Sequence, residues 1–342
     1  MIMSSNQAGI DEKIRQIENI FVETPQIKEI FEDIDEAMDT ARIIDYKKQP
    51  TSILITAQSG MGKTTIFDHY LAKYPRYQAE EGDVVPVLSS TLLDDKSPKG
   101  APGHMLRDLG DWLQGKGGTR GELTDRFVVQ CNGVKVEAIF IDEFQNAIEN
   151  GSDNIIWNTS EWIKTLVNLT GRPVILFGMP YSKQVIDTNI ALIKRFPVIH
   201  HIDEYDLETA SGWLIFLDEV DNQLPFEAKV GLADEELGVR LMCAAGGNLS
   251  RLMKQIIRPA AKKAVRAGET KLTIDQLLKA SIKIQRVPME SNPLNFDVPL
   301  DSLEVVHEIA ETQYNKPYSR KGNWKYRQVA TEEKLSRVLS KN

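Results

Sequence analysis

The sequence is poor in cysteine and has no long hydrophobic run. Its 342 residues include two cysteines, Cys131 and Cys243, too few for a disulfide framework and typical of a protein in a reducing cytosol. No stretch of about 18 consecutive apolar residues occurs, which argues against a membrane span. The N-terminal residues lack a basic segment followed by an apolar one, so we expect no secretory signal. These absences predict a cytoplasmic protein with no membrane partner.

An excess of positive charge is also missing, and the charge is unevenly distributed. The formal net charge is −8. Residues 316–342 contain eight lysines and arginines against two glutamates, a net charge of +6, which leaves −14 on the rest. Tyr318, Trp324 and Tyr326 lie among these basic residues. This basic tail is expected to dock on a partner protein or on nucleic acid. The alternative is a solvated, partly disordered terminus.

Short apolar runs alternate with helical patterns over the first 205 residues. The spacing of apolar residues over 11–48 predicts helices, one of them starting at Pro25 after an N-cap at Thr24. Helical patterns also occupy 63–71, a segment from Pro102 through Leu113, and 161–169. Strands are expected at 51–56, 83–89, 136–142, 173–178 and 200–203. This alternation predicts an α/β fold with a five-stranded parallel sheet between helices.

The strand pattern stops near residue 206. Apolar spacing over 206–285 predicts a small, all-helical lid domain. Prolines at 288, 293 and 299 predict a linker, and 301–314 reads as a last short helix before the basic tail. The expected organisation is therefore a helical lead-in (1–48), an α/β domain (49–205), a lid (206–285) and a C-terminal segment of linker, short helix and tail (286–342).

The strongest motif is AQSGMGKT at 57–64, which matches a phosphate-binding loop at its last three positions. Ala57 stands where a glycine is usual. Glycines in this loop let backbone N–H groups point at phosphate oxygens, and the next helix adds its N-terminus. Lys63 is expected to contact the β- and γ-phosphates of ATP, and Thr64 to ligate Mg²⁺. The candidate nucleotide-binding residues are Ser59, Gly60, Met61, Gly62, Lys63, Thr64 and Thr65. The alternative is a glycine-rich turn with an unrelated lysine.

The second motif is a pair of carboxylates, Asp142 and Glu143, at the end of the most apolar strand. Asp142 is expected to hold Mg²⁺ together with Thr64, and Glu143 to act as the general base toward water. Two acidic residues at a strand exit would mean little alone. Their place about 80 residues after a phosphate-binding loop favours the functional interpretation.

Three weaker signals concern cations. Arg195 is a candidate arginine finger for a neighbouring subunit, and Arg251 a candidate nucleotide contact from the lid. Loop lysines and an arginine are candidate contacts to DNA phosphates. These DNA candidates are Lys96, Lys99, Lys116 and Arg120. For each group the alternative is a solvated surface cation.

With these motifs in this order, residues 10–285 resemble an AAA+ ATPase. More narrowly, the chain resembles the transposon-encoded regulators of the TniB/TnsC type, through the segments FVETP (21–25), SGMGKTT (59–65), FIDEFQN (140–146) and FGMP (177–180). The resemblance implies a homo-oligomeric ring or filament that binds ATP, Mg²⁺ and double-stranded DNA. It also implies that the protein passes a target site to a transposase and other target-selection proteins, and that ATP hydrolysis drives disassembly.

One departure from the family pattern affects this expectation. Many AAA+ proteins place a polar residue at the end of the fourth strand to orient water, but this chain has Gly178-Met179 there. We therefore expect slow hydrolysis, which suits a switch. A second functional hypothesis remains open, in which the chain is the ATPase of a secretion or replication-loading machine that acts on protein partners.

Overall fold

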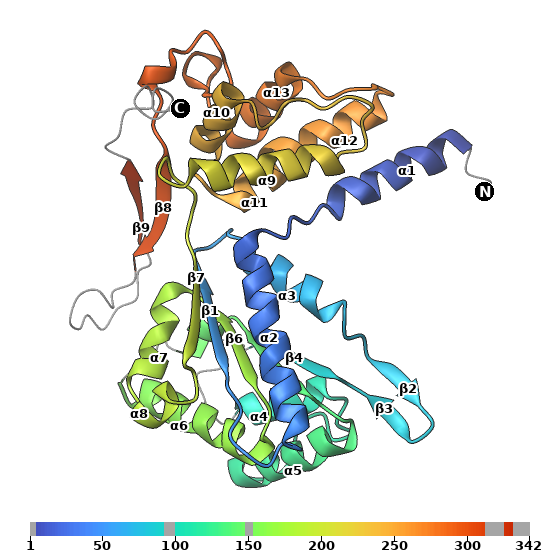
Figure 1. Cartoon of the computed structure of the whole chain (residues 1–342), viewed down its shortest axis with the longest axis vertical. Coiled ribbons are helices and arrows are strands. Elements are labelled where there is room, and N and C mark those ends of the chain that lie inside the picture. Colours follow the sequence, from blue (N-terminus) through green and yellow to red (C-terminus); the bar gives the residue numbers. More distant parts are fainter. Residues whose placement is uncertain (1–4, 92–99, 148–152, 312–324, 331–342) are drawn as a thin grey trace.

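A parallel β-sheet forms the centre of the α/β domain (Figure 1). A computed structural model of the chain describes residues 5–91, 100–147, 153–311 and 325–330. Within these residues the sheet has five strands in the order β4-β5-β6-β1-β7. The strands are β1 (Ile53–Ala57), β4 (Val87–Thr91), β5 (Ala138–Asp142), β6 (Val174–Gly178) and β7 (Val198–Ile202). The predicted five-stranded parallel sheet is confirmed.

Both faces of this sheet are covered by helices, because successive side chains of a strand point to opposite faces. In β1, Ile53 and Ile55 pack toward α2 (Pro25–Ile43) and α3 (Lys63–Leu71), whereas Leu54 packs toward the opposite layer. That layer consists of α4 (Gly100–Asp108), α5 (Arg120–Gly133), α6 (Asp153–Thr170), α7 (Lys183–Asp187) and α8 (Ile190–Ile193). Helix α2 begins as predicted, with the Thr24 side chain accepting a hydrogen bond from the Ile27 backbone N–H.

Two predictions about the first half of the chain are wrong. The strand expected at 83–89 is interrupted at Pro86, so β3 (Gly82–Val84) forms a hairpin with β2 (Tyr77–Ala79) and only β4 joins the sheet. The helix expected to reach Leu113 ends at Asp108. Trp112 does not continue its buried stripe, because its side chain is 84% exposed.

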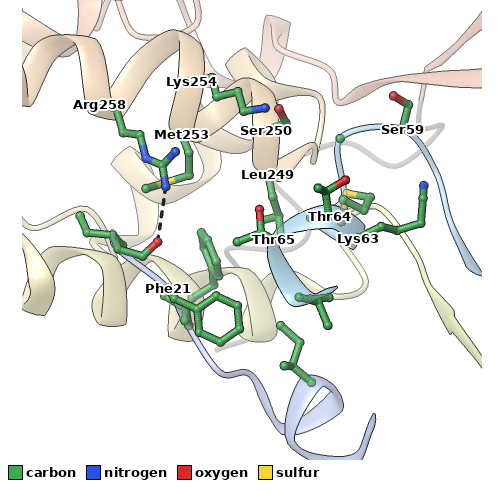
Figure 2. Close-up of a pocket in the computed structure, with 18 of the residues that line it drawn as sticks. Phe21, Ser59, Lys63, Thr64, Thr65, Leu249, Ser250, Met253, Lys254 and Arg258 are labelled. Atoms are coloured by element: carbon green, nitrogen blue, oxygen red, sulfur yellow. Dashed lines mark hydrogen bonds between the residues drawn. The ribbon is translucent and has the colours of Figure 1, made fainter. Parts of the chain in front are cut away.

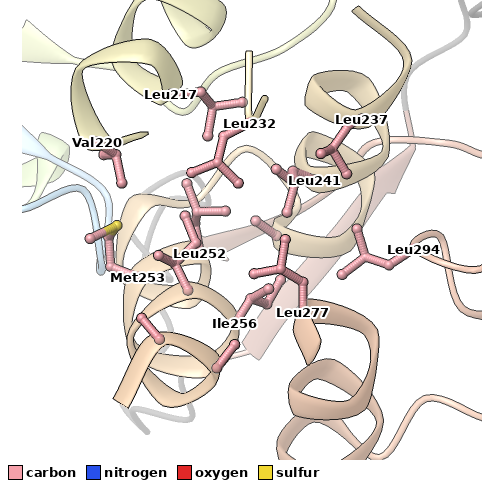
Figure 3. Packing of buried hydrophobic residues seen from close by; sticks show 14 of the residues in the cluster. Leu217, Val220, Leu232, Leu237, Leu241, Leu252, Met253, Ile256, Leu277 and Leu294 are labelled. Carbon is pink, nitrogen blue, oxygen red and sulfur yellow. The ribbon is translucent and has the colours of Figure 1, made fainter. Parts of the chain in front are cut away.

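The lid is helical, as predicted, and lies beyond the carboxyl ends of the strands (Figure 1). Its elements are α9 (Ala210–Gln223), α10 (Glu235–Ala245), α11 (Leu249–Arg251), the π-helical segment η3 (Leu252–Ile257), α12 (Arg258–Arg266) and α13 (Ile274–Gln285). Leucines and isoleucines from these elements form one hydrophobic core (Figure 3). In the part of the chain that the structure describes, no helix is long and apolar enough to cross a membrane.

The expected lead-in (1–48) is divided between the two parts of the molecule. Helix α1 (Ser5–Glu18) packs on the lid through Ile17, which belongs to the lid core. Glu18 forms an ion pair with Lys262 of α12, with 2.5 Å between oxygen and nitrogen. Helix α2, by contrast, packs on the sheet. Residues 19–24 therefore connect the lid to the sheet.

The predictions for the C-terminal segment are also partly wrong. Residues 286–305 do not form a free linker, because Leu294 and Val305 are buried in the lid core. The guanidinium of Arg240, itself 2% exposed, donates hydrogen bonds to the carbonyls of Pro293, Asn295 and Val298. Two short 3₁₀ turns, η4 (Met289–Ser291) and η5 (Leu300–Ser302), interrupt this stretch. The helix expected at 301–314 is absent from the described residues: β8 (Val306–Glu311) pairs antiparallel with β9 (Lys325–Ala330). Most of the basic tail lies outside the described residues.

Candidate nucleotide-binding site

A cavity of about 370 Å³ lies between the phosphate-binding loop and the lid (Figure 2). The seven candidate nucleotide-binding residues from Ser59 to Thr65 all line it, and so does Glu143. Phe21 lies at the opposite end of the cavity from the loop. Lid residues between Leu249 and Arg258 form its upper wall. The cavity therefore joins the two parts of the molecule.

The loop adopts the geometry that its glycines predict. Gly60 and Gly62 both have φ of +86°, a conformation that other residues rarely adopt. Gly62 is the N-cap of α3, so the N-terminus of this helix and its unpaired N–H groups face the cavity. This arrangement suits an anion such as a phosphate.

Lys63 is held inside the loop. Its ammonium donates hydrogen bonds to the carbonyls of Ala57 (2.6 Å) and Gln58 (3.1 Å). Burial lowers the pKa of Lys63 to about 8, although the Glu143 and Asp142 carboxylates oppose that shift. The ammonium is the positive charge that the loop itself offers to a phosphate.

Asp142 and Glu143 leave β5 in different environments. Asp142 is 7% exposed, and one carboxylate oxygen accepts a hydrogen bond from the Glu143 backbone N–H at 2.8 Å. Burial raises the pKa of Asp142, which that hydrogen bond and Lys63 oppose. Glu143 lines the cavity and has φ of +54°, an uncommon conformation for a residue with a side chain. The strained turn directs the second carboxylate into the cavity.

Oxygen donors near the loop fit a Mg²⁺ ion. Mg²⁺ prefers oxygen ligands and usually retains water molecules and phosphate oxygens besides one or two protein groups. Thr64 lines the cavity with an exposed hydroxyl-bearing side chain at the start of α3, and Asp142 keeps an oxygen beyond the one bonded to Glu143. Asp142 is not among the residues that line the cavity, so a joint role of these two residues in holding the ion stays a prediction.

The far end of the cavity is apolar. Phe21 lies at this end, and its ring stacks on His69 with 3.7 Å between centroids. Val22, Ile27, Phe216 and Met253 add further apolar side chains to the cavity lining. Gln223 of α9 fixes Phe21 by accepting from its backbone N–H and donating to its carbonyl. Burial lowers the pKa of His69, which favours a neutral ring in this stack. A flat aromatic base fits such a lining.

Lid residues hold the phosphate-binding loop directly. The Asn248 side chain donates to the Ser59 carbonyl at 2.8 Å, and the Ser250 backbone N–H donates to the Gly60 carbonyl at 2.8 Å. Asn248 also caps α11 by accepting from the Arg251 backbone N–H. Movement of the lid is therefore coupled to the loop.

We expect Asn248→Ala to weaken ATP binding about two- to tenfold, because a net hydrogen bond contributes about 0.5–1.5 kcal/mol. Thr273→Ala is the matched control, since Thr273 caps α13 in the same lid by pairing with Gln276, whereas Asn248 also hydrogen-bonds to Ser59 of the loop. Both variants should lose roughly 1 kcal/mol of stability with the cap. Equilibrium titration with ATP should show weaker binding in the Asn248 variant alone; equal affinities would contradict this role.

Arg251 does not line this cavity. It lines a separate one of about 350 Å³, with Cys243, Gln285 and Val306. The lid cations that do line the nucleotide cavity are Lys254 and Arg258 (Figure 2). Arg258 donates to the Ile20 carbonyl at 3.4 Å and pairs with Glu18. The π-helical segment η3 changes the angular spacing of side chains after Arg251, which the sequence spacing did not indicate.

The C-terminal segment contacts the lid at the turn between α10 and α11. Gly246 lies against the Val306 carbonyl, and His307 hydrogen-bonds to the Gly246 carbonyl and to Glu204, each at 3.2 Å. Glu204 in turn accepts from Asn248 at 3.1 Å. The root of β8 is therefore linked through Glu204 and Asn248 to the phosphate-binding loop.

This attachment should depend on pH. The hydrogen bond with Glu204 raises the pKa of His307 above its ordinary value, despite partial burial. The stabilisation is therefore fully present below the unfolded pKa of about 6.5, and is lost as pH rises through the higher folded value. We expect the melting temperature of the wild type to exceed that of His307→Gln by more at pH 6 than at pH 8. A difference that does not change with pH would contradict the assignment.

Arg195 lies at the edge of the sheet away from this cavity. Its carbonyl accepts from the Ser52 backbone N–H at the start of β1, and its guanidinium donates to Asn168 of α6 and to the Ala191 carbonyl. Arg195 is therefore not among the residues that line the nucleotide cavity of its own chain. The exposed side chains of Ile190, Ile193 and Ile199 are close to it in the sequence. A role toward a neighbouring subunit stays a prediction.

The four DNA candidates are not gathered at one described place. Lys116 is exposed on the turn after α4, and its carbonyl accepts from Arg126. Arg120 is the first residue of α5, not part of a loop, and lies half-buried against α6 in a cavity of about 320 Å³. Burial lowers its pKa. Lys96 and Lys99 lie outside the described residues.

The sequence interpretation overlooked several residues at the cavity: Gln145, Met179, Lys254 and Arg258. The segment FIDEFQN contains Gln145 two positions after Glu143, and the polar amide so near the strand end is the signal that was available. No comparable signal existed for Lys254 and Arg258, because their orientation depends on the π-helical segment.

The chain is similar in structure to several solved proteins. The chain is similar to Cdc6p from Pyrobaculum aerophilum, with a TM-score of 0.51 and 14% identity over 81% of this chain and 72% of that one. The ORC2 protein of Aeropyrum pernix, solved with ADPNP and ADP, gives a TM-score of 0.48 and 14% identity over 74% of this chain and 68% of that one. The A. pernix ORC1 protein in complex with DNA gives 0.47 and 15%, over 76% and 65%.

The likeness to Cdc6p agrees with the architecture described above. The parallel sheet, the loop between β1 and α3 and the helical lid together form an AAA+ fold. No curated protein matches the chain significantly. The family model described as the bacterial TniB protein matches residues 13–205, more than half of the chain. The chain therefore belongs to the TniB family of AAA+ fold proteins.

Proposed function

We propose that the protein is an ATP-dependent DNA-binding regulator of DNA transposition, which marks a target site and recruits a transposase. The observation that carries this proposal is the cavity in which a phosphate-binding loop, Lys63 and Glu143 face an apolar end beside Phe21. A nucleoside triphosphate fits such a cavity, and membership of the TniB family favours transposition as its use.

In the proposed reaction, Lys63 binds the β- and γ-phosphates and Glu143 orients the attacking water. The carboxylate of Glu143 accepts the proton as the water oxygen bonds to the γ-phosphorus and the bond to the ADP oxygen breaks. Mg²⁺ held by Thr64 and Asp142 would neutralise negative charge on the phosphates. Hydrolysis then ends the ATP-bound state, and we infer that assemblies on DNA come apart.

We further propose that protomers assemble into a ring or filament on double-stranded DNA. Arg195 and the exposed isoleucines near it would face the next subunit, where the guanidinium would contact the γ-phosphate. Lys116 and Arg120 are the described candidates for phosphate contacts, together with Lys96 and Lys99. The basic tail would dock the transposase. Its attachment at β8 supports this role, because β8 is linked to the phosphate-binding loop.

Filter binding with random-sequence duplex DNA tests this proposal. We expect binding with ATP that weakens with salt and shows no preference for a short sequence, since phosphate contacts carry no sequence information. Lys116→Ala should flatten the log–log salt slope by about one. Gln114→Ala, on the same turn, is the uncharged control. DNA binding that does not depend on ATP, or no DNA binding, would favour the alternative hypothesis, an ATPase of a secretion or replication-loading machine that acts on protein partners.

A further inference from the structure

We infer that Gln145 is a positioning residue for Glu143 and takes the role of the polar residue that the end of the fourth strand lacks. This inference rests on the proposed ATP hydrolysis. Gln145 belongs to the short helix η1 (Phe144–Ala147) that follows β5, and it lines the nucleotide cavity although only 6% of it is exposed.

Both ends of the Gln145 amide are engaged. Its nitrogen donates a hydrogen bond to a Glu143 carboxylate oxygen, and its oxygen accepts from the Met179 backbone N–H at 3.2 Å. A buried amide with both ends satisfied is fixed in orientation, because losing either partner leaves an unpaired polar group. Gln145 therefore determines where one oxygen of Glu143 lies and leaves the other available to a water molecule.

The backbone explains why a residue so near in sequence can return to Glu143. Glu143 has φ of +54°, and its carbonyl accepts from the Asn146 backbone N–H at 2.9 Å, which closes a tight turn. Phe144, which is fully buried, anchors that turn in the core behind the sheet. The strain at Glu143 is the kind that persists where the surroundings fix a functional geometry.

Met179 links this pair to the phosphate-binding loop. It follows β6, at the place where many AAA+ proteins have a polar sensor side chain, and its backbone N–H donates a hydrogen bond to Gln145. Its sulfur lies 3.6 Å from the Lys63 ammonium. Glu143, Gln145, Met179 and Lys63 thus form a continuous chain of contacts around the cavity. The polar group beside the end of β6 is therefore the amide of Gln145, which comes from the end of β5.

The test compares Gln145→Met with the wild type, because methionine keeps the length of the side chain and removes both hydrogen bonds. We expect the turnover number for phosphate release to fall about ten- to a hundredfold, a part of the contribution that a well-placed general base makes. The ATP dissociation constant should stay within about twofold, since Gln145 binds Glu143 and Met179 and not the loop. A variant that lost affinity and turnover equally would overturn the positioning role in favour of a structural one.

A double-mutant cycle separates an effect through Glu143 from general damage. Adding Gln145→Met to Glu143→Gln should change the residual turnover little, because the group that Gln145 positions is already disabled. Independent, multiplicative losses would overturn the inference. Unchanged turnover in Gln145→Met would overturn this role alone. A wild type that releases no phosphate would overturn the proposed ATPase function and the role of Gln145 with it.

Discussion

The Lys63→Ala variant should lose ATP binding by about a hundredfold or more and keep its fold. Charge-assisted hydrogen bonds contribute about 1.5–3 kcal/mol each, and two phosphates would share this ammonium. The fold should survive because, among the residues that the structure describes, the ammonium hydrogen-bonds only to the carbonyls of Ala57 and Gln58 and contacts the Met179 sulfur. Titration with ATP and a thermal melt measure the two properties separately.

Lys73→Ala is the control for that variant. Lys73 follows α3 and packs its ammonium over the Phe31 ring at 4.4 Å, away from the cavity lining. It should bind ATP as the wild type does. Wild-type affinity should also fall as pH rises above about 8, because the free Lys63 loses its proton there. If Lys63→Ala bound ATP with the affinity of the wild type, the assignment of the nucleotide-binding site would be wrong.

The second large effect is expected in Glu143→Gln, which should bind ATP and release phosphate about 10²- to 10⁴-fold more slowly. The amide keeps the shape of the carboxylate but cannot accept a proton. Its complexes with DNA should outlast those of the wild type, if hydrolysis ends the assembled state. Steady-state phosphate release measures the loss.

Glu137→Gln is a matched control at the other end of the same strand. Glu137 precedes β5 and pairs with Arg42 at 2.6 Å, far from the loop in the register of the sheet. This variant should hydrolyse ATP normally. If Glu143→Gln also turned over at the wild-type rate, Glu143 would not be the general base.

Local sequence patterns predicted those parts of the fold in which runs of apolar residues coincide with buried strands. Three strands of the sheet, β1, β5 and β6, are apolar runs in which every residue is buried, so their sequence pattern predicts a buried strand directly. The phosphate-binding loop was predictable for a related reason: Gly60 and Gly62 are required by a backbone conformation that few other residues adopt.

Two kinds of contact account for the errors. Helix α4 ends before Trp112 because Gly110 adopts φ of +86° and the Asp111 backbone N–H closes the helix end on the Leu106 carbonyl at 2.9 Å, a local signal that the apolar spacing did not include. Asp111, 3% exposed, then turns inward to pair with Arg126 of α5, a partner 15 residues away that helical spacing alone could not reveal. Residues 306–311 form a strand because they pair with 325–330 across an intervening segment. Local helix propensity gave no information about this pairing.

The lid side of the site illustrates a third limit. Arg251 was a candidate lid contact because it follows a glycine turn at the start of a helix, but the lid cations that line the cavity are Lys254 and Arg258, whose orientation depends on the π-helical segment that begins at Leu252. The hydrogen bond from the Asn248 side chain to the Ser59 carbonyl joins residues far apart in the chain. Such a contact follows from the packing of the lid on the loop, not from either segment alone.

The most direct test of the central claim is sedimentation of Glu143→Gln with labelled duplex DNA long enough for several protomers, in the presence of ATP or ADP. We predict large complexes on DNA with ATP, and free DNA with ADP. Adding Lys63→Ala to the same chain should abolish the large complexes, since nucleotide binding is then lost. Complexes of the same size with ATP, with ADP and without Lys63 would contradict an ATP-dependent assembly on DNA.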